Sequence, residues 1–127
     1  MKLAIFSPQV RLDDLRNMTD RFNGLIVNNR PDGEEPGQPS HEEIESAAYD
    51  AGLRVAHLPF VGMPDAATVA AVADLLASET GEVLMFCRSG TRSAIVWALA
   101  EASRGADPDA IRAHTARAGY DLSRLTL

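Results

Sequence analysis

The chain is poor in cysteine, with only Cys87 among its 127 residues. A single cysteine excludes an internal disulfide and any metal site built from several thiolates, and it is typical of a reducing compartment. No apolar run approaches the length of a transmembrane helix. Residues 1–6 lack the pattern of a secretory signal, because their short apolar run is broken by Pro8. We therefore expect a cytoplasmic protein.

Positive charge is also scarce, since 12 lysines and arginines stand against 18 aspartates and glutamates, for a formal net charge of −6. Binding to nucleic acid or to an anionic membrane calls for clustered basic surface, so we expect neither partner. The three histidines have no close ligand spacing, and we expect no metal and no cofactor. His41 is expected to be solvated, His57 to lie in the core and His114 to lie on a polar helix face.

What remains has the composition of an ordinary globular protein, with 46% apolar and 24% charged residues. The apolar patterns predict strands over 2–6, 25–27, 54–58 and 83–86, and helices over 11–21, 41–51, 66–78, 93–104 and 108–118. Strands and helices alternate, which predicts an α/β fold with a mainly parallel central sheet of about four strands flanked by helices. Residues 1–127 fit a single domain of this kind.

Several helix ends carry local signals. Ser40 and Glu43 have the spacing of a capping box, and Asp107 precedes a proline that suits the first helical position. Gly24 is expected to close the first helix and Ser93 to cap the fourth. Residues 120–127 are expected to form a docked tail or a short turn.

The segment that follows the strand over 83–86 carries the strongest chemical signal. It is a short polar loop with the only cysteine, two arginines, a glycine and three hydroxyls, and it runs directly into a helix. Backbone N–H groups and a helix N-terminus suit an anion. In such a place the pKa of Cys87 would fall from about 8.5 to ~3.5–7.5. An isolated cysteine here would be an ordinary buried residue, but its polar neighbours favour a nucleophile.

The loop predicts specific roles. Six residues run from Cys87 to Arg92, few enough to curl round an oxyanion with N–H groups converging on it. Arg92 is expected to clamp the anion with two parallel bonds. Ser93 is expected to hold the helix start and to donate to the thiolate. The expected anion-binding residues are Arg88, Ser89, Gly90, Thr91 and Ser93.

Two further loops are expected beside this one, after Val27 and after Leu58. In parallel sheets, ligands bind at the carboxyl ends of the strands, so loops that follow different strands meet there. The segment over 28–39 is rich in proline and glycine, and Arg30 and Asp32 are candidates for a wall of the site. The alternative is a surface loop without function.

The run from Cys87 to Ser93 resembles the active-site loop of rhodanese sulfurtransferases, in which four residues separate cysteine and arginine. Tyrosine and dual-specificity phosphatases have five, usually after a histidine, and this chain has Phe86 in that place. When the loops are aligned on Gly90, the phosphatase arginine falls on Ser93.

The wider chain resembles a third family, the bacterial phosphatase-like domain related to beta-lactamase-hydrolase-like proteins. The similar segments are 29–34, 38–39, 58–59 and 87–93. The resemblance implies a dual-specificity-phosphatase-like fold and leaves the reaction open.

We favour a phosphatase-like hydrolase that forms a covalent Cys87 intermediate with a small oxyanion or phosphorylated substrate. Asp65, or else Asp32, would protonate the leaving group. The alternative role of Asp65 is simply the N-cap of the helix over 66–78. A sulfurtransferase that carries a persulfide on Cys87 is the closest alternative and needs no such acid. A non-catalytic oxyanion-binding module is less favoured, and it would tolerate Cys87→Ser.

Overall fold

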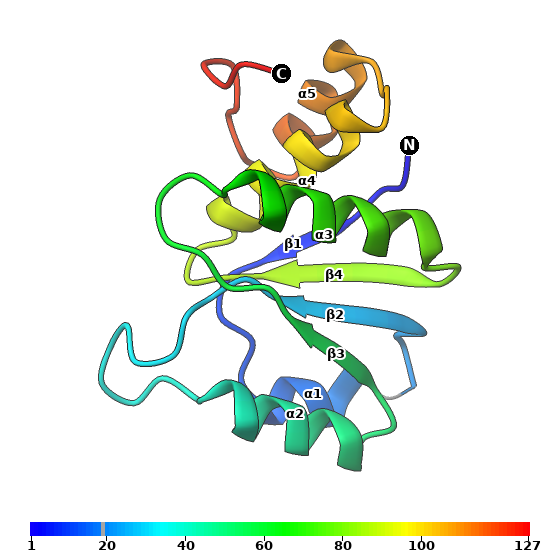
Figure 1. Ribbon diagram of the computed structural model, residues 1–127. Coiled ribbons are helices and arrows are strands. Elements are labelled where there is room, and N and C mark those ends of the chain that lie inside the picture. The colour runs from blue at the N-terminus through cyan, green and yellow to red at the C-terminus, as the bar shows by residue number, and fades with distance from the viewer. Residues whose placement is uncertain (19) are drawn as a thin grey trace.

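The computed structural model describes residues 1–18 and 20–127. In them four strands form one sheet, in the order β1-β4-β2-β3, and every neighbouring pair is parallel. The strands are β1 (Ile5–Ser7), β2 (Gly24–Asn28), β3 (Arg54–His57) and β4 (Glu82–Phe86). Their carboxyl ends therefore lie at one edge of the sheet (Figure 1).

Helices cover both faces of this sheet. They are α1 (Leu12–Met18), α2 (His41–Asp50), α3 (Ala66–Ser78), α4 (Thr91–Ser103) and α5 (Pro108–Arg117). The first two lie on one face, α3 and α4 lie on the other, and α5 packs against α4 (Figure 1). The predicted α/β architecture is confirmed. None of these helices is long and apolar enough to cross a membrane.

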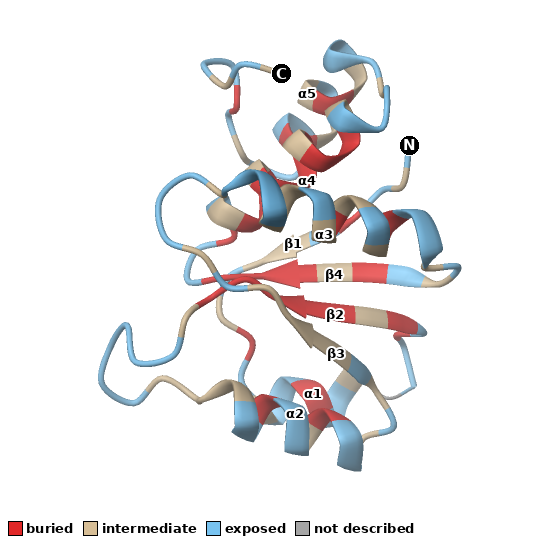
Figure 2. Ribbon diagram, viewed as in Figure 1, coloured by how far each residue is buried: buried red, intermediate tan, exposed pale blue. Residues whose placement is uncertain are grey.

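Strand β4 separates two hydrophobic cores, because successive side chains of a strand point to opposite faces. Val83 and Met85 pack with Trp97 of α4 in one core. Leu84 and Phe86 pack in the other, with residues of α1 and α2. Figure 2 shows that buried residues are concentrated on β2 and β4, the two central strands. Burial on both faces holds the end of β4 rigidly in place.

Local sequence signals fixed most element boundaries. Helix α3 has the predicted bounds, and Asp107 caps α5 through a bond from the Asp109 N–H. The capping box is present, since the Ser40 hydroxyl accepts the Glu43 N–H at 3.1 Å and the Glu43 carboxylate accepts the Ser40 N–H at 3.1 Å. Strand β1 lies at the edge of the sheet and is shifted from the predicted 2–6.

Two predicted helix boundaries are wrong. Gly24 does not close α1 but opens β2, and a Cβ there would lie 1.8 Å from the Glu82 carbonyl oxygen, so crowding between strands explains the glycine. Ser93 does not cap α4, because the helix begins at Thr91 after Gly90. Helix α1 ends at Met18, and the predicted continuation through 19 lies outside the described residues.

The histidines also differ from expectation. His57 bonds the Arg30 carbonyl through Nε2 but is only partly buried, on the edge strand β3. His41 is not solvated, because its side chain is only 15% exposed and its ring stacks on His57 with centroids 4.1 Å apart. His114 does not lie on a polar face, since its Nε2 bonds the Ala4 carbonyl at 2.8 Å and its ring packs on Trp97.

Candidate active site

Three loops meet at the carboxyl edge of the sheet, and Asn29 joins them. Its N–H donates to the Phe86 carbonyl at 2.8 Å, and its side-chain amide donates to the Leu58 carbonyl at 3.0 Å. Its Oδ1 accepts the Ser93 hydroxyl at 2.8 Å. Asn29 and Ser93 are both fully buried. The predicted convergence of the loops is confirmed, and the Ser93 hydroxyl serves it instead of donating to the thiolate.

The loop that follows β4 turns its N–H groups inward. The Arg88 carbonyl accepts the Gln9 N–H at 3.2 Å, and the Ser89 carbonyl accepts the Tyr120 hydroxyl at 3.0 Å. A trans peptide directs its C=O and N–H to opposite sides, so these outward carbonyls turn the next N–H groups toward the loop centre. The Gly90 N–H indeed donates to Cys87 Sγ at 3.1 Å. The sulfur thus accepts a backbone N–H of the loop that surrounds it.

Tyr120, from the segment after α5, lies directly against this loop. Gly90 has φ +94°, and a Cβ there would lie 2.0 Å from the tyrosine hydroxyl. Burial raises the pKa of Tyr120, and the charge of Cys87 raises it further. The phenol therefore keeps its proton and its bond to Ser89. The predicted docking of the tail is confirmed, with Leu122 buried as well.

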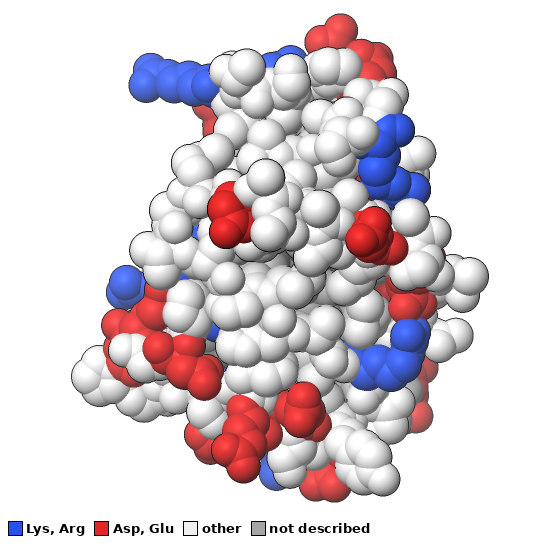
Figure 3. Space-filling model, in the orientation of Figure 1, with Lys and Arg blue, Asp and Glu red and all other residues white. Residues whose placement is uncertain are grey.

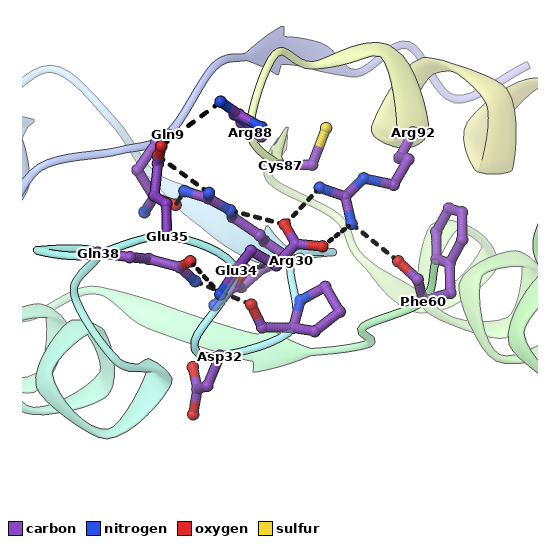
Figure 4. A network of polar contacts seen from close by, with 12 residues as sticks. Gln9, Arg30, Asp32, Glu34, Glu35, Gln38, Phe60, Cys87, Arg88 and Arg92 are labelled. Atoms are coloured by element: carbon purple, nitrogen blue, oxygen red, sulfur yellow. Dashed lines mark hydrogen bonds and ion pairs between the residues drawn. The ribbon is translucent and has the colours of Figure 1, made fainter. Parts of the chain in front are cut away.

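Arg92 holds a carboxylate of the protein itself. Its Nη2 lies 2.7 Å from Glu34 Oε1 and its Nη1 lies 2.9 Å from Oε2, while Nη1 also donates to the Phe60 carbonyl at 3.0 Å (Figure 4). Hydrogen bonding from Arg92 lowers the pKa of Glu34 to about 2. The same bond raises the pKa of Arg92, and Cys87 adds to that shift. Glu34 and Arg92 are therefore both charged, and the side chain of Arg92 is close enough to interact with the sulfur of Cys87.

Arg30 lies behind this pair. Its guanidinium is 1% exposed and reaches Glu34 at 2.8 Å, Glu35 at 3.0 Å and the Gln9 amide oxygen at 2.9 Å. These partners occupy all three nitrogens, so Arg30 supports the site from inside rather than forming an open wall. Glu34 is consequently held between two guanidinium groups (Figure 4).

The other loop residues lie at the rim. The side chain of Arg88 is 66% exposed and approaches Glu35 at 3.5 Å. The hydroxyl of Ser89 donates to that of Thr91 at 3.1 Å at the start of α4. In the view of Figure 3, acidic side chains gather over α2 and the loop after β2. The arginines of the site therefore face carboxylates of the protein itself and lie beside acidic surface.

The two aspartates predicted as acids both cap helices. Asp65 accepts the Thr68 N–H at 2.8 Å, which lowers its pKa, and its side chain is exposed. Asp32 accepts the His41 N–H at 2.8 Å, and its carboxylate points away from Cys87 (Figure 4). The capping role of Asp65 is thus present, while a catalytic role for either residue stays a prediction.

Sequence reasoning missed the roles of several site residues, namely Gln9, Asn29, Glu34, Glu35 and Tyr120. Gln9 and Asn29 follow the carboxyl ends of β1 and β2, so the edge rule for parallel sheets could have identified them. Glu34 lies four residues after Arg30, in the segment over 28–39 that the sequence predicts as a wall of the site. Nothing local indicated Tyr120.

The site brings together a buried thiol, a loop whose backbone N–H donates to the sulfur, and the guanidinium of Arg92. This arrangement suits attack by the sulfur on the central atom of an oxyanion. The family model for the beta-lactamase hydrolase-like protein, phosphatase-like domain, matches residues 2–104. A beta-lactamase hydrolase-like protein of Xylella fastidiosa is 38% identical over 125 residues, which are 97% of this chain and 29% of that relative. The chain therefore spans less than a third of the length of that relative.

Solved structures agree with this assignment. A candidate phosphatase from Neisseria meningitidis matches with a TM-score of 0.81 and 28% identity, over 97% of this chain and 94% of that one. The active form of Tk-PTP matches with a TM-score of 0.67 and 22% identity, over 94% and 82% of the two chains, and shows the same fold. The dual-specificity-phosphatase-like fold implied by the sequence is confirmed. The chain belongs to the phosphatase-like domain family of the beta-lactamase hydrolase-like proteins.

Proposed function

We propose that this protein is a cysteine-dependent phosphatase that hydrolyses a phosphate monoester through a covalent intermediate on Cys87. The observation that carries the proposal is the bond of 3.1 Å from the Gly90 N–H to Cys87 Sγ, inside a loop whose carbonyls face outward. The N–H groups of this loop would hold the oxygens of a phosphoryl group. The family and the Neisseria structure support phosphatase activity in general.

The reaction would take two steps. In the first, the Cys87 thiolate attacks phosphorus, an S–P bond forms, and the P–O bond to the leaving group breaks with its electron pair on oxygen. In the second, water attacks phosphorus, the S–P bond breaks, and the thiolate and inorganic phosphate are released. The Cys87 side chain is 0% exposed, so substrate must displace whatever covers the sulfur.

Arg92 would bind the phosphoryl oxygens while Glu34 orients it. Three of the five guanidinium N–H groups are engaged by Glu34 and the Phe60 carbonyl, which leaves two for an anion. Because Glu34 fixes the plane of the guanidinium, these two donors are oriented before substrate arrives.

Sulfur transfer is the second candidate, favoured by the four residues that separate Cys87 and Arg92. Here the thiolate would attack the outer sulfur of thiosulfate, an S–S bond would form, and sulfite would leave with the electron pair. Cyanide would then take the outer sulfur as thiocyanate and restore the thiolate. The product held between the two steps would be a Cys87 persulfide.

One paired assay distinguishes these reactions. Wild type and Cys87→Ser are each tested with para-nitrophenyl phosphate and with thiosulfate plus cyanide, and Tyr49→Phe on the exposed surface of α2 is the control. We expect wild type and control to release phosphate and Cys87→Ser to be inactive. Phosphate release that survives loss of the thiol would contradict both candidates. Phosphate binding without turnover would indicate an anion-binding module.

The mass of the untreated protein gives an independent answer. Added mass of one sulfur, removed by cyanide, would favour the persulfide route over the phosphatase.

A further inference from the structure

We propose that the substrate is a phosphoryl compound whose leaving group departs as a stable anion, either an aryl phosphate ester or an acyl phosphate anhydride, because none of the described side chains near Cys87 is placed to protonate that group. The inference rests on the proposed phosphatase function and specifies its substrate class.

The two glutamates beside the loop are held by arginines. Glu34 lies between Arg30 and Arg92, and Glu35 reaches Arg30 at 3.0 Å and Arg88 at 3.5 Å. An opposite charge at such a distance favours the ionised carboxylate. The pKa of Glu34, lowered to about 2, agrees with this. Glu34 is therefore ionised at neutral pH, and each carboxylate oxygen of Glu35 faces an arginine.

The two aspartates serve α2 and α3. Asp32 accepts the backbone N–H of His41 and Asp65 accepts that of Thr68, each at 2.8 Å. The bond from Thr68 lowers the pKa of Asp65. Asp32 also points away from the sulfur (Figure 4). Protonating either residue would weaken the start of its helix.

The remaining donors are already engaged. The Tyr120 hydroxyl donates to Ser89, and its raised pKa opposes giving up the proton. His57 donates its Nε2–H to the Arg30 carbonyl at 3.0 Å. His41 stacks on His57, and burial lowers its pKa, which favours the neutral ring.

Apolar side chains occupy the loop next to Arg92. The Phe60 carbonyl accepts from Arg92 at 3.0 Å, and the Phe60 N–H donates to the Asn29 carbonyl at 3.3 Å, so the start of this loop is fixed at the site (Figure 4). Residues 60–64 contain no titratable side chain. Val61 is 73% exposed and Met63 is 60% exposed. Residues 60–64 therefore supply no proton to a leaving group.

The consequence is a specific bond-breaking step. Sulfur bonds to phosphorus, the P–O bond breaks, and the electron pair leaves on an aryloxide or carboxylate, which takes a proton from water only after departure. An alkoxide is too basic to leave in this way without a general acid, whose usual contribution is about 10²–10⁴-fold.

The test is the dependence of kcat/KM on the leaving group in the wild-type protein. We expect para-nitrophenyl phosphate to be hydrolysed, phenyl phosphate to react at least about 100-fold more slowly and an alkyl phosphate not to react, in line with a missing acid. A difference below about threefold between the two aryl esters would overturn the inference. If even para-nitrophenyl phosphate is not hydrolysed, it is the proposed function that fails.

Two variants provide a second test of the missing acid. Asp65→Asn and Asp32→Asn both keep an oxygen that can cap the helix, so the fold is retained. We expect each to hydrolyse phenyl phosphate at the wild-type rate. A loss of about 100-fold on phenyl phosphate, with para-nitrophenyl phosphate unaffected, would identify that residue as the acid and overturn the inference.

Discussion

At the scale of single residues, the pairing of Arg92 with Glu34 determines how the site is prepared. Glu34 and the Phe60 carbonyl take three of the five guanidinium N–H groups, so they fix the plane of Arg92 and orient the two N–H groups that remain for an oxyanion. Arg30, which is 1% exposed, holds Glu34 from the other side. Removing any one of these charges would leave a partner poorly compensated.

Arg92→Lys is therefore expected to lose most activity. A lysine ammonium is a point charge and cannot keep both bonds to Glu34 at 2.7 and 2.9 Å while it also binds substrate. We expect kcat/KM for an activated aryl phosphate to fall at least about 100-fold, the usual loss for an oxyanion donor. Arg104→Lys, whose arginine pairs with Glu101 at the end of α4, is the matched control. Near-normal turnover in Arg92→Lys would mean that another arginine binds the substrate.

At the scale of elements, the loop after β4 depends on the segment after α5. The Tyr120 hydroxyl orients the peptide between Ser89 and Gly90, and the ring leaves no room for a side chain at Gly90. The chain thus returns from its C-terminal part to set the direction of an N–H group in the site.

Comparison of two glycines tests this contact. Gly90 and Gly105 both have positive φ, +94° and +90°, but a Cβ on Gly105 would meet nothing within 4 Å. Gly105→Ala should cost only the backbone strain, about 1–2 kcal/mol in urea unfolding. Gly90→Ala should cost more and lower kcat, because Tyr120 must move away from Ser89. Equal losses of stability and unchanged kcat would show that the contact is unimportant.

The sequence predicted elements where their causes are local. The capping box at Ser40 and the bounds of α3 depend on neighbouring residues, and both were found. Gly24 and Ser93 were misassigned because their causes lie far along the chain, at Glu82 and Asn29. The same reason hid Tyr120, which bonds a residue 31 positions earlier.

At the scale of the whole molecule, the parallel sheet brings the distant parts of the site together. Asn28 at the end of β2 connects the loop after β2 to α2. Its Oδ1 accepts the Arg30 N–H at 2.9 Å, and its side-chain amide donates to His41 Nδ1 at 3.1 Å. His57 binds the Arg30 carbonyl and stacks on His41. The backbone that leads to Glu34 is therefore tied to a neutral imidazole on α2.

This arrangement predicts a loss of stability in mild acid. Burial, and then the charge of His57, lower the pKa of His41 below its ordinary 6.5, although Glu45 and Asp32 partly oppose this. The unfolded chain takes up a proton near pH 6.5 and the folded chain only at lower pH, so the unfolded state binds more protons between these values. The free energy of unfolding should therefore be level with respect to this group above about pH 7 and fall as the pH drops below about 6.5.

Urea unfolding of wild type and His41→Gln at about pH 7.5, 6.5 and 5.5 measures this effect. Glutamine cannot be protonated, so the variant should lose less stability than wild type between about pH 6.5 and 5.5, even if it is less stable throughout. His114→Gln is the matched control, because that ring lies away from the site against Ala4 and Trp97. Parallel decline of wild type and His41→Gln would contradict the prediction, because the proton uptake would then belong to other groups. A smaller decline in His41→Gln, but not in His114→Gln, would assign the loss of stability in acid to the His41 imidazole. That imidazole accepts from Asn28, which in turn holds the backbone of Arg30.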